Sequence, residues 1–332
     1  MAQRTTPPSP GTAPGDQPYH VPVMAAQVVD LLAPVAPGVI VDATFGGGGH
    51  TRALLDASPD VSVLGLDRDP DARSQVPDGT RTRLVTANFA DLAQVLADPG
   101  TGRWVHDRDP HAASGGGVAG VLLDLGVSSH QLDQPERGFS YRLAGPIDMR
   151  MGPDAPGTAA DLVAEADAGE LTRIFSRYGE EQFARRIADA IVAGRPFAGT
   201  AELADAIAAA VPAAARRRRH PARKVFQALR IAVNDELGAL ERGLEAAIDA
   251  VRPGGRIVVI AYHSLEDRMV KQRFTRGAAG CTCPPEIPVC RCGNVAELRR
   301  LTRKPLIPDA AEIAANPRSR SARLRAVEKV AA

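Results

Sequence analysis

Residues 39–51 read VIVDATFGGGGHT, and this stretch decides the fold. A β-branched run ends at the carboxylate of Asp42, turns through four glycines and enters a helical pattern at Arg52. Glycines permit positive φ and leave no Cβ between the backbone and a ligand. A helix N-terminus just beyond adds free N–H groups and a partial positive charge. Strand, glycine turn and helix predict a nucleotide-type binding corner, although the turn alone would also fit a tight connection.

The next apolar run supplies a partner for that corner. Residues 61–66 read VSVLGL, which is typical of a buried strand, and the run ends at Asp67. An acidic residue about 20 positions after the glycines is where a dinucleotide-binding fold holds a ribose. We expect Asp67 to bind a ribose rather than to be a surface turn residue.

Other strand ends carry further polar and aromatic side chains. A third strand leads to Phe89, which is expected either to stack on an adenine or to pack in the core. A fourth strand ends at Asp124, and a fifth ends beside His263. Ligands of open parallel sheets bind outside the carboxyl ends of the strands. The sequence therefore predicts one site at this edge. These three strands cover residues 82–87, 121–123 and 256–261.

Composition limits the class of protein. At 332 residues the chain is long enough for about two domains. Hydrophobic residues make up 44%, and no apolar run reaches about 18 residues, so no membrane span is expected. The N-terminus has no apolar stretch after a basic segment, so no secretory signal is expected. The net charge of +1 does not by itself indicate nucleic acid. All four cysteines lie between Cys281 and Cys292, so a cytoplasmic location is expected.

Local charge differs from the global balance. Five arginines and a lysine fall within nine residues, at 216–219, Arg223 and Lys224. Such a cluster would either hold phosphates or form a solvated face. A second basic segment contains Arg318, Arg320, Arg323 and Arg325.

Helices are expected between the fourth and fifth strands. Residues 146–219 show no strand alternation, and Thr158 and Asp161 form a capping box. A single long helix with one apolar face is expected over 226–248. This pattern predicts a helical insertion between sheet strands.

Three further segments complete the expectations. Residues 98–117 are expected to form an exposed insertion without a site. A second capping box is expected at Ser264 and Asp267. Two Cys-x-Cys pairs could bind zinc or could lie in a mobile tail with reactive thiols, and no metal site is predicted. These pairs are Cys281 with Cys283 and Cys290 with Cys292.

These patterns divide the chain into five parts. A sheet domain is interrupted by the helical insertion, preceded by a disordered extension and followed by a Cys-containing basic tail. The parts are the extension 1–17, the first sheet part 18–145, the insertion 146–222, the second sheet part 223–275 and the tail 276–332.

Four separated motifs follow one another along the chain, and their order is informative together with their residues. They are DATFGGGGH at 42–50, LDLGVSS at 123–129, ERGFS at 136–140 and YHSLED at 262–267. Together they resemble the signatures of the MraW family of ribosomal RNA small-subunit methyltransferases, over roughly residues 20–271. The N-terminal extension, the insertion at 98–117 and the long tail depart from the family pattern and put only loop geometry in doubt.

The resemblance implies both a fold and a reaction. The fold would be α/β, a class I (Rossmann-like) methyltransferase sheet with an inserted all-helical domain. The reaction would be S-adenosylmethionine-dependent methylation of the N4 amine of a cytosine in the decoding region of 16S rRNA, within the small ribosomal subunit. Whether the chain acts as a homodimer is left open. In the family, S-adenosylmethionine is the methyl donor. The positions that match the family's contacts with this donor are Gly48, Gly49, His50, Asp67, Phe89, Asp124 and Gln131.

Three side chains are expected to serve the transfer itself. Asp124 lies where amino-methyltransferases place an acceptor for the target amine. Tyr141 would stack on an unpaired target base, and His263 would orient the base or its phosphate. The sequence identifies no general base.

Two other functions compete with this one. A NAD-dependent Rossmann oxidoreductase would use the same corner, but Thr51 stands where the last glycine of its fingerprint would be. A non-catalytic RNA-binding protein would keep the fold without using a methyl donor. ATP hydrolysis is disfavoured because the loop lacks the lysine of a phosphate-cradling motif.

Overall fold

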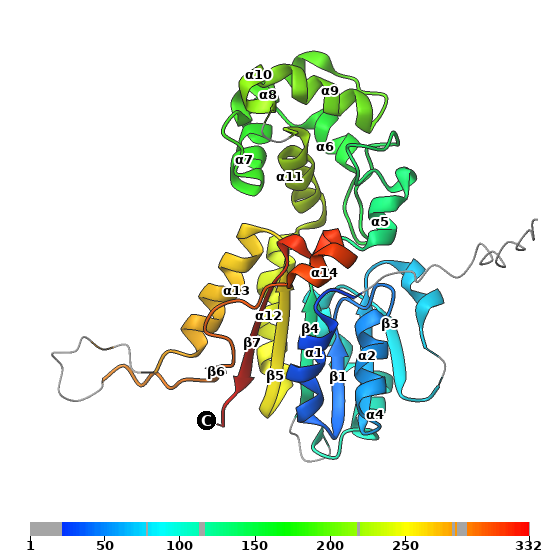
Figure 1. The fold of residues 1–332 in the computed structure, drawn as a ribbon, viewed down its shortest axis with the longest axis vertical. Coiled ribbons are helices and arrows are strands. Elements are labelled where there is room, and N and C mark those ends of the chain that lie inside the picture. The colour runs from blue at the N-terminus through cyan, green and yellow to red at the C-terminus, as the bar shows by residue number, and fades with distance from the viewer. Residues whose placement is uncertain are drawn as a thin grey trace, which may run out of the picture.

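A seven-stranded sheet forms the base of the molecule in this computed structural model (Figure 1). The structure describes residues 22–77, 79–112, 117–217, 220–280, 283 and 291–331, so the extension expected at 1–17 lies outside the described residues. The strand order is β3-β2-β1-β4-β5-β7-β6. The strands are β1 (Gly38–Asp42), β2 (Val61–Asp67), β3 (Thr82–Thr86), β4 (Val118–Asp124), β5 (Val251–Ala261), β6 (Leu298–Arg300) and β7 (Arg323–Lys329).

The first five strands run parallel, and helices cover both faces of the sheet. Strands β1, β2 and β4 are buried along almost their whole length, as parallel strands with two covered faces should be. One face packs on α1 (Ala25–Leu32) and α2 (Gly49–Ala57). The other face packs on α3 (Leu92–Ala97), α4 (Pro99–His106), α12 (Glu236–Ala250) and α13 (Ser264–Gly277).

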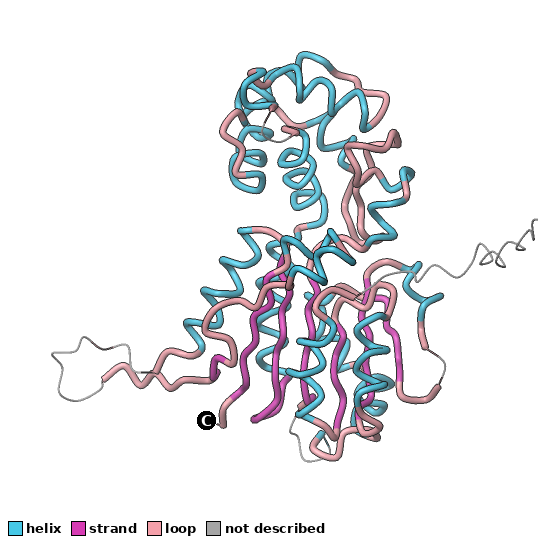
Figure 2. The backbone as a smooth tube through the Cα atoms, viewed as in Figure 1, coloured by secondary structure: helices cyan, strands magenta, loops and turns pink. Residues whose placement is uncertain are grey.

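A helical insertion follows β4 and has its own apolar core, which runs from Phe139 to Val233. Figure 2 shows the helices of this part standing above the sheet, which holds the strands. The capping box of Thr158 and Asp161 is confirmed. The core includes α11, whose residues after Ala222 were expected to belong to the second sheet part. The helices are α5 (Ser129–Asp133), α6 (Ala159–Glu165), α7 (Ala168–Gly179), α8 (Ala184–Gly194), α9 (Thr200–Ala210), α10 (Ala213–Arg216) and α11 (Ala222–Asn234).

The single helix expected over 226–248 is wrong, because the chain forms two helices, α11 and α12. They meet at Asp235, whose φ of 47° is left-handed. The Asn234 side chain accepts a hydrogen bond from the Met151 N–H at 2.8 Å and donates one to the Met149 carbonyl at 2.7 Å. Apolar periodicity does not reveal this break, since both helices keep an apolar face: α11 buries its face in the insertion, and α12 buries its face against the sheet.

The C-terminal part is more than the expected tail. Strand β7 pairs antiparallel with β5, and β6 pairs antiparallel with β7, so the last residues complete the sheet. Arg325 of β7 is buried and ion-paired with Asp267 of α13 at 2.7 Å. Arginines inside a strand concealed the strand pattern from the sequence.

Two smaller expectations are corrected. Residues 98–117 are not merely an exposed insertion, because they include α4 and the fully buried Asp109. Asp109 accepts a hydrogen bond from the Val39 N–H at 2.9 Å and pairs with Arg252 at 3.1 Å. The second capping box consists of His263 and Glu266, one residue earlier than expected, because the His263 side chain accepts the hydrogen bond from the Glu266 N–H.

The expected fold, a class I methyltransferase sheet with an inserted helical domain, is confirmed. Within the described ranges, no helix is both long and apolar enough to cross a membrane.

Candidate active site

A cleft opens at the carboxyl ends of β1, β2 and β4, where the sheet meets the helical insertion. Its empty volume of about 990 Å³ includes space open to solvent. Residues of the glycine loop, of the strand ends and of α5 line it. Of the seven expected donor contacts, Gly48 alone does not line the cleft. The six that do are Gly49, His50, Asp67, Phe89, Asp124 and Gln131.

The glycine loop between β1 and α2 divides two tasks between its glycines. Gly46 and Gly48 are both left-handed, with φ of 51° and 67°. A Cβ built on Gly48 would lie 2.9 Å from the Phe45 ring, so the turn itself requires glycine there. A Cβ on Gly46 would meet only the Thr44 carbonyl oxygen, 3.9 Å away. Gly46 therefore presents bare backbone to the cleft, as a bound donor molecule would need.

Asp67 ends β2 and faces the glycine loop. Its Oδ2 accepts a hydrogen bond from the Gly46 N–H at 2.6 Å, and its Oδ1 accepts one from the Asp69 N–H at 2.8 Å. Burial raises the pKa of Asp67 to about 6, although these two hydrogen bonds act in the opposite direction. Each carboxylate oxygen has a second lone pair. The carboxylate can therefore still accept hydrogen bonds from two ribose hydroxyls.

Buried polar groups lie behind the glycine loop. Asp42 accepts a hydrogen bond from the Thr51 hydroxyl at 2.7 Å, and burial raises the pKa of Asp42. The Nε2 atom of His50 lies 3.3 Å from Oδ2 of Asp124. Burial lowers the pKa of His50, but the carboxylates of Asp124 and Asp42 outweigh it, so the net pKa is raised. Within the described residues, Oδ1 of Asp42 and Nδ1 of His50 have no hydrogen-bond partner, which fits a polar ligand group beside His50.

Asp124 is held from three sides. Its backbone N–H donates to the Thr44 hydroxyl at 2.6 Å, and its Oδ1 accepts a hydrogen bond from the Tyr262 hydroxyl at 2.8 Å. Burial, followed by the Asp124 charge, raises the pKa of Tyr262 well above its usual value, so the hydroxyl remains a donor. His50 approaches the other carboxylate oxygen. These contacts fix the direction of the Asp124 carboxylate in the cleft.

Tyr262 lines the cleft but was not expected as a site residue from the sequence. The neighbouring His263 was expected there instead, and it does not line the cleft. The signal was present, since Tyr262 follows the last residue of β5, at the same carboxyl edge as Asp124. The choice between two successive side chains depends on the direction in which each one points, and the sequence does not show this.

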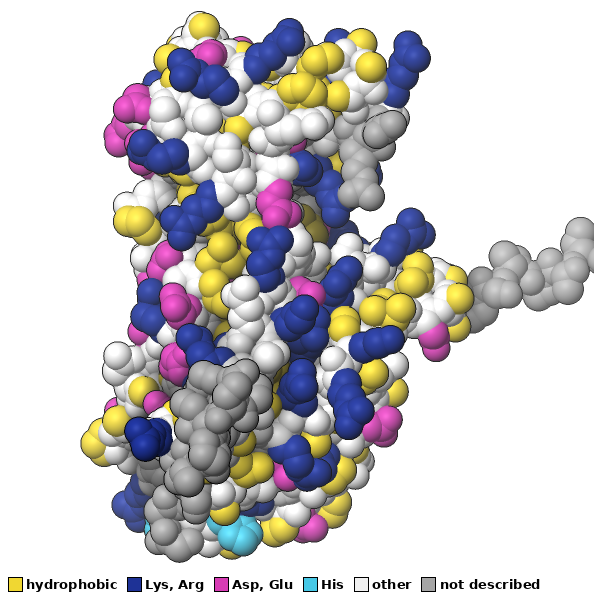
Figure 3. Space-filling view, turned by 90° about the vertical axis from the view of Figure 1, so that its left-hand side faces the viewer, with side chains coloured by type: hydrophobic (Ala, Val, Ile, Leu, Met, Phe, Trp, Pro, Cys, Tyr) yellow, Lys and Arg dark blue, Asp and Glu magenta, His cyan; other side chains and the backbone are white. Residues whose placement is uncertain are grey.

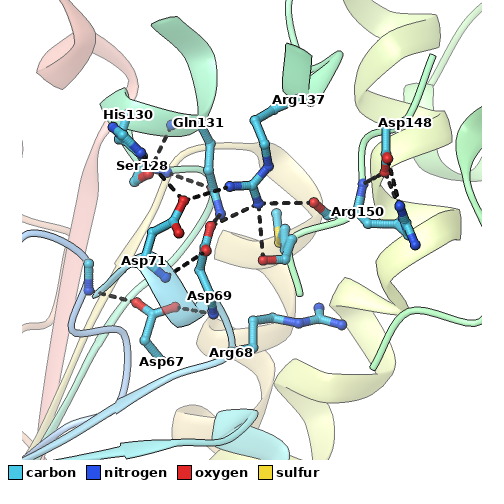
Figure 4. Close-up of polar contacts among 12 residues, drawn as sticks. Asp67, Arg68, Asp69, Asp71, Ser128, His130, Gln131, Arg137, Asp148 and Arg150 are labelled. Atoms are coloured by element: carbon cyan, nitrogen blue, oxygen red, sulfur yellow. Dashed lines mark hydrogen bonds and ion pairs between the residues drawn. The ribbon is translucent and has the colours of Figure 1, made fainter. Parts of the chain in front are cut away.

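A network of charged side chains joins β2 to the insertion (Figure 4). Oδ2 of Asp69 accepts a hydrogen bond from Gln131 at 2.8 Å and pairs with Arg137 at 2.8 Å. Arg137 also reaches Asp71 at 3.6 Å. Oε1 of Gln131 accepts a hydrogen bond from the Ser128 N–H at 3.1 Å, which fixes its amide. The two parts of the chain thus build one wall of the cleft together.

The Phe89 ring contacts both α12 and the cleft, and its stacking on an adenine stays a prediction. Phe89 opens the 3₁₀ turn η3 (Phe89–Asp91) and lies against α12, where a Cβ on Gly243 would come 2.5 Å from its ring. The ring also lines the cleft. A glycine on α12 thus leaves space for an aromatic wall.

Two of the expected catalytic residues do not line the cleft. Tyr141 lies in the insertion, where its ring stacks on His220 at a centroid distance of 5.0 Å and meets the edge of Phe226. His263 caps α13, and its Nδ1 accepts a hydrogen bond from the Glu266 N–H at 3.3 Å. In this conformation both side chains contact other parts of the protein.

His263, Glu266 and Glu236 bring three potential metal-ligand atoms within 4.8 Å of one another. However, Arg230 donates to both carboxylate oxygens of Glu236, at 2.7 and 2.8 Å. Burial raises the pKa of Glu266, but His263 and Arg230 lower it more, so the net pKa is lowered. We interpret the cluster as an ion-paired joint between α11, α12 and α13.

The expected basic cluster lies in the insertion. Arg216, Arg217 and Arg223 are exposed, and Lys224 donates to the Glu180 carbonyl at 2.6 Å. The remaining expectations of this kind lie outside the described residues, namely those on Arg218, Arg219, Cys281 and Cys290.

Comparisons with known proteins cover nearly the whole chain. A family model described as the MraW methylase family matches residues 17–330. A Geobacter sulfurreducens protein named ribosomal RNA small subunit methyltransferase H is 52% identical over 321 residues, which is 94% of this chain and 99% of the relative. Proteins of the same name from Heliobacterium modesticaldum and Symbiobacterium thermophilum are 50% and 49% identical, over 94% and 95% of this chain and 99% and 98% of theirs.

Proposed function

Because the chain belongs to the MraW methylase family, we propose that it transfers a methyl group from S-adenosylmethionine to the N4 amine of a cytosine in the decoding region of 16S rRNA. The chain is a methyltransferase, and its relatives are named for the ribosomal RNA of the small subunit. The N4 position and the decoding region rest on the resemblance of the four sequence motifs. One observation carries the proposal: Asp124, oriented by Tyr262, faces the same cleft as the glycine loop and Asp67.

The sheet itself disfavours the oxidoreductase alternative. A dinucleotide-binding sheet has six parallel strands in the order 3-2-1-4-5-6. Here an antiparallel β7 lies between β5 and β6. The reversed strand belongs to a methyltransferase sheet, and NAD binding is not part of the proposal.

The cleft residues suit the parts of the donor. When bound, S-adenosylmethionine supplies an electrophilic methyl group. We assign its ribose to Asp67, its adenine to Phe89 and its amino-acid portion to the glycine loop with Gly49 and His50. Gln131 contributes indirectly, because its amide already holds Asp69. Gly48 acts through the shape of the turn.

Asp124 has the role of an acceptor at the target amine. A cytosine amine is a weak nucleophile because its lone pair is delocalised into the ring. A hydrogen bond from N4–H to a fixed carboxylate would orient the amine and localise that lone pair. For the transfer, N4 would have to face the methyl group of the donor at about 3–3.5 Å. Tyr262 and His50 keep the carboxylate in place. The proton of the methylated amine leaves to water, so no general base is required.

The substrate is best supplied as an unpaired nucleotide of the small subunit, in the cytoplasm. Removing a base from its stack costs a few kcal/mol, and the cost is smallest for an unpaired base. Tyr141 stays our candidate for a stacking platform. His263 stays our candidate for orienting the substrate, acting through the start of α13. A homodimer is not required by any of these steps.

The test uses the Asp124→Ala variant, purified small subunits and labelled donor. We expect methylation to be abolished, while circular dichroism shows a folded protein. Full activity in this variant would end the assignment. Mapping methylated nucleotides in rRNA from cells without this protein would then identify the position: a cytosine that keeps its N4 methyl group would contradict the proposed substrate.

A further inference from the structure

The C-terminal part of the chain is strongly basic. Residues 298–329 contain nine Lys and Arg but three Asp and Glu, whereas the whole chain has a net charge of only +1. This part includes β6, β7 and the helix α14 (Ala310–Ala315), with the 3₁₀ turn η6 (Pro317–Ser321) between α14 and β7. The excess charge needs an explanation beyond solubility, because like charges repel within one segment.

Five of these nine cations already have partners. Arg299 pairs with Glu328, Arg318 pairs with Asp133, and Lys329 donates to the Ile248 carbonyl. Arg323 and Arg325 both pair with Asp267. Four others are exposed and have no ion-pair or hydrogen-bond partner in the described part of the chain. We call these four the C-terminal basic edge: Arg300, Arg303, Lys304 and Arg320.

The basic edge runs from β6 to the mouth of the cleft. After β6 the chain returns beside β7, where Leu306 pairs with Leu324 in an isolated bridge. It then enters α14, whose Glu312 accepts a hydrogen bond from the Met24 N–H at 2.5 Å. Pro22, two residues before Met24, lines the cleft.

A second contact places Arg320 near the cleft. Arg318, two residues earlier, pairs with Asp133 of α5. His130 and Gln131 of the same short helix line the cleft. The segment thus borders the cleft on the side of the sheet and on the side of the insertion. Figure 3, which faces this side of the molecule, shows Lys and Arg side chains in a line from the insertion down over the sheet.

We propose that the C-terminal basic edge binds the sugar–phosphate backbone of the RNA whose base enters the cleft. This inference rests on the proposed function, and it identifies the surface that holds the substrate. Four cations without a partner among the described residues, placed between β6 and the cleft mouth, suit a linear polyanion. Its position at the cleft mouth suits a strand that presents one nucleotide there. Helix α10, which ends at Arg216 of the basic cluster that the sequence singled out, lies at the far end of the insertion from the sheet (Figure 1).

The test is the salt dependence of RNA binding by the full chain. The variant is Arg303→Gln/Lys304→Gln/Arg320→Gln, and the probe is a 16S rRNA transcript in a filter-binding titration. Each lost contact to a single strand should flatten the slope of log K against log salt by about 0.7, so the triple variant should lose about 2. Binding of S-adenosylmethionine, measured by calorimetry, should stay the same.

A matched control carries the same change of charge elsewhere. Arg103→Gln/Arg173→Gln/Arg186→Gln replaces three exposed arginines on α4, α7 and α8. We expect the slope of this control to equal that of the unmodified chain. An equal loss of slope in both triple variants would show a general charge effect and overturn the proposal, as would no loss in the first variant.

Two further results separate the surface from the function. If the first triple variant binds both the methyl donor and RNA normally, the proposed RNA-binding role of the basic edge is overturned, and the methyltransferase proposal stays intact. An unmodified chain that binds neither donor nor RNA would overturn the proposed function itself. Exposed Leu306 and Ile307 lie beside the edge, so vesicles containing phosphatidylserine form a third arm. Loss of vesicle binding with an unchanged RNA slope would assign the edge to a membrane and contradict the proposal.

Discussion

At the Asp67 carboxylate, burial acts against the charge and two backbone N–H groups act in its favour. Burial raises its pKa to about 6, so the free protein holds it in an environment that disfavours its charge. Two backbone N–H groups already donate hydrogen bonds to its carboxylate oxygens. Ribose hydroxyls would add hydrogen bonds that stabilise the ionised form of Asp67. Binding of S-adenosylmethionine should therefore be linked to the ionisation of Asp67.

Donor affinity is expected to depend on pH around 6. Below about pH 6 Asp67 is protonated in the free protein, because its pKa is about 6. The ribose hydroxyls donate better hydrogen bonds to the ionised carboxylate. The affinity for S-adenosylmethionine should therefore rise as the pH rises through 6 and then level off. Calorimetry in two buffers of different ionisation enthalpy should detect proton release at the lower pH. In Asp67→Asn, affinity should fall by a factor of about ten to a hundred and this pH dependence should disappear. A pH profile that is the same in both proteins would contradict the ribose assignment.

Tyr262 is expected to control turnover more than donor affinity. Tyr262→Phe keeps the ring but removes the hydrogen bond at 2.8 Å that orients Asp124. A hydrogen bond to a charged group contributes about 1.5–3 kcal/mol, so methylation should slow by about tenfold to a hundredfold. Single-turnover rates with small subunits would measure this. Tyr178→Phe, in the insertion, is the matched control and should keep the full rate. A Tyr262→Phe protein as fast as this control would show that the contact does not matter.

At the scale of elements, the break between α11 and α12 separates the two cores. Asn234 is buried, and its side chain makes hydrogen bonds to the backbone at Met149 and Met151. Arg68 of the β2 end also donates to the Asn234 carbonyl and pairs with Asp154. The end of α11 is therefore fixed to both the insertion and the sheet.

Asn234→Ala should lower the free energy of unfolding by about 2–4 kcal/mol, because it leaves a buried N–H and a buried carbonyl without partners. Urea denaturation followed by circular dichroism would measure the loss. Asp235→Gly is the neighbouring control. It removes the left-handed strain at φ 47° but adds flexibility to the unfolded chain, so its effect should stay within about 1 kcal/mol of zero. If the two substitutions cost the same, the side chain of Asn234 is not what makes the break.

At the scale of the whole molecule, the C-terminal strands are part of the sheet that holds the site. Strand β7 covers the edge of β5, and its Arg325 is buried with Asp267. Strand β5 ends at Ala261, and the next residue, Tyr262, donates a hydrogen bond to Asp124. The last residues of the chain are thus linked through two strands to the proposed acceptor.

Asp267→Asn should destabilise the protein strongly. The side chains of Asp267 and Arg325 are only 11% and 10% exposed, and removing one charge leaves the other buried without a partner, at a cost of about 3–5 kcal/mol. Glu245→Gln is the control on the same face, since Glu245 is 49% exposed and its pair with Arg273 should contribute less than about 1 kcal/mol. Thermal unfolding monitored by calorimetry would compare the two. Equal melting temperatures would show that β7 does not depend on this pair.

The sequence by itself determined the parallel part of the sheet and the edge at which the cleft lies. Strands such as β1 and β2 read as short β-branched runs, because both of their faces are buried. The glycine loop and Asp67 could be located because left-handed turns need glycine and because ligands bind at strand ends. These are local rules, and the structure follows them.

The tertiary structure alone decided what depends on distant partners. Strand β7 forms because β5 offers an edge and Asp267 receives its arginines, and no pattern within residues 323–329 shows this. The break at Asp235 depends on a loop more than eighty residues earlier in the chain, which Asn234 contacts. Tyr262 faces the cleft because its hydroxyl meets Asp124 of another strand, whereas His263 caps its own helix. Side-chain direction and long-range pairing are properties of the folded chain, because they arise from contacts between residues far apart in the sequence.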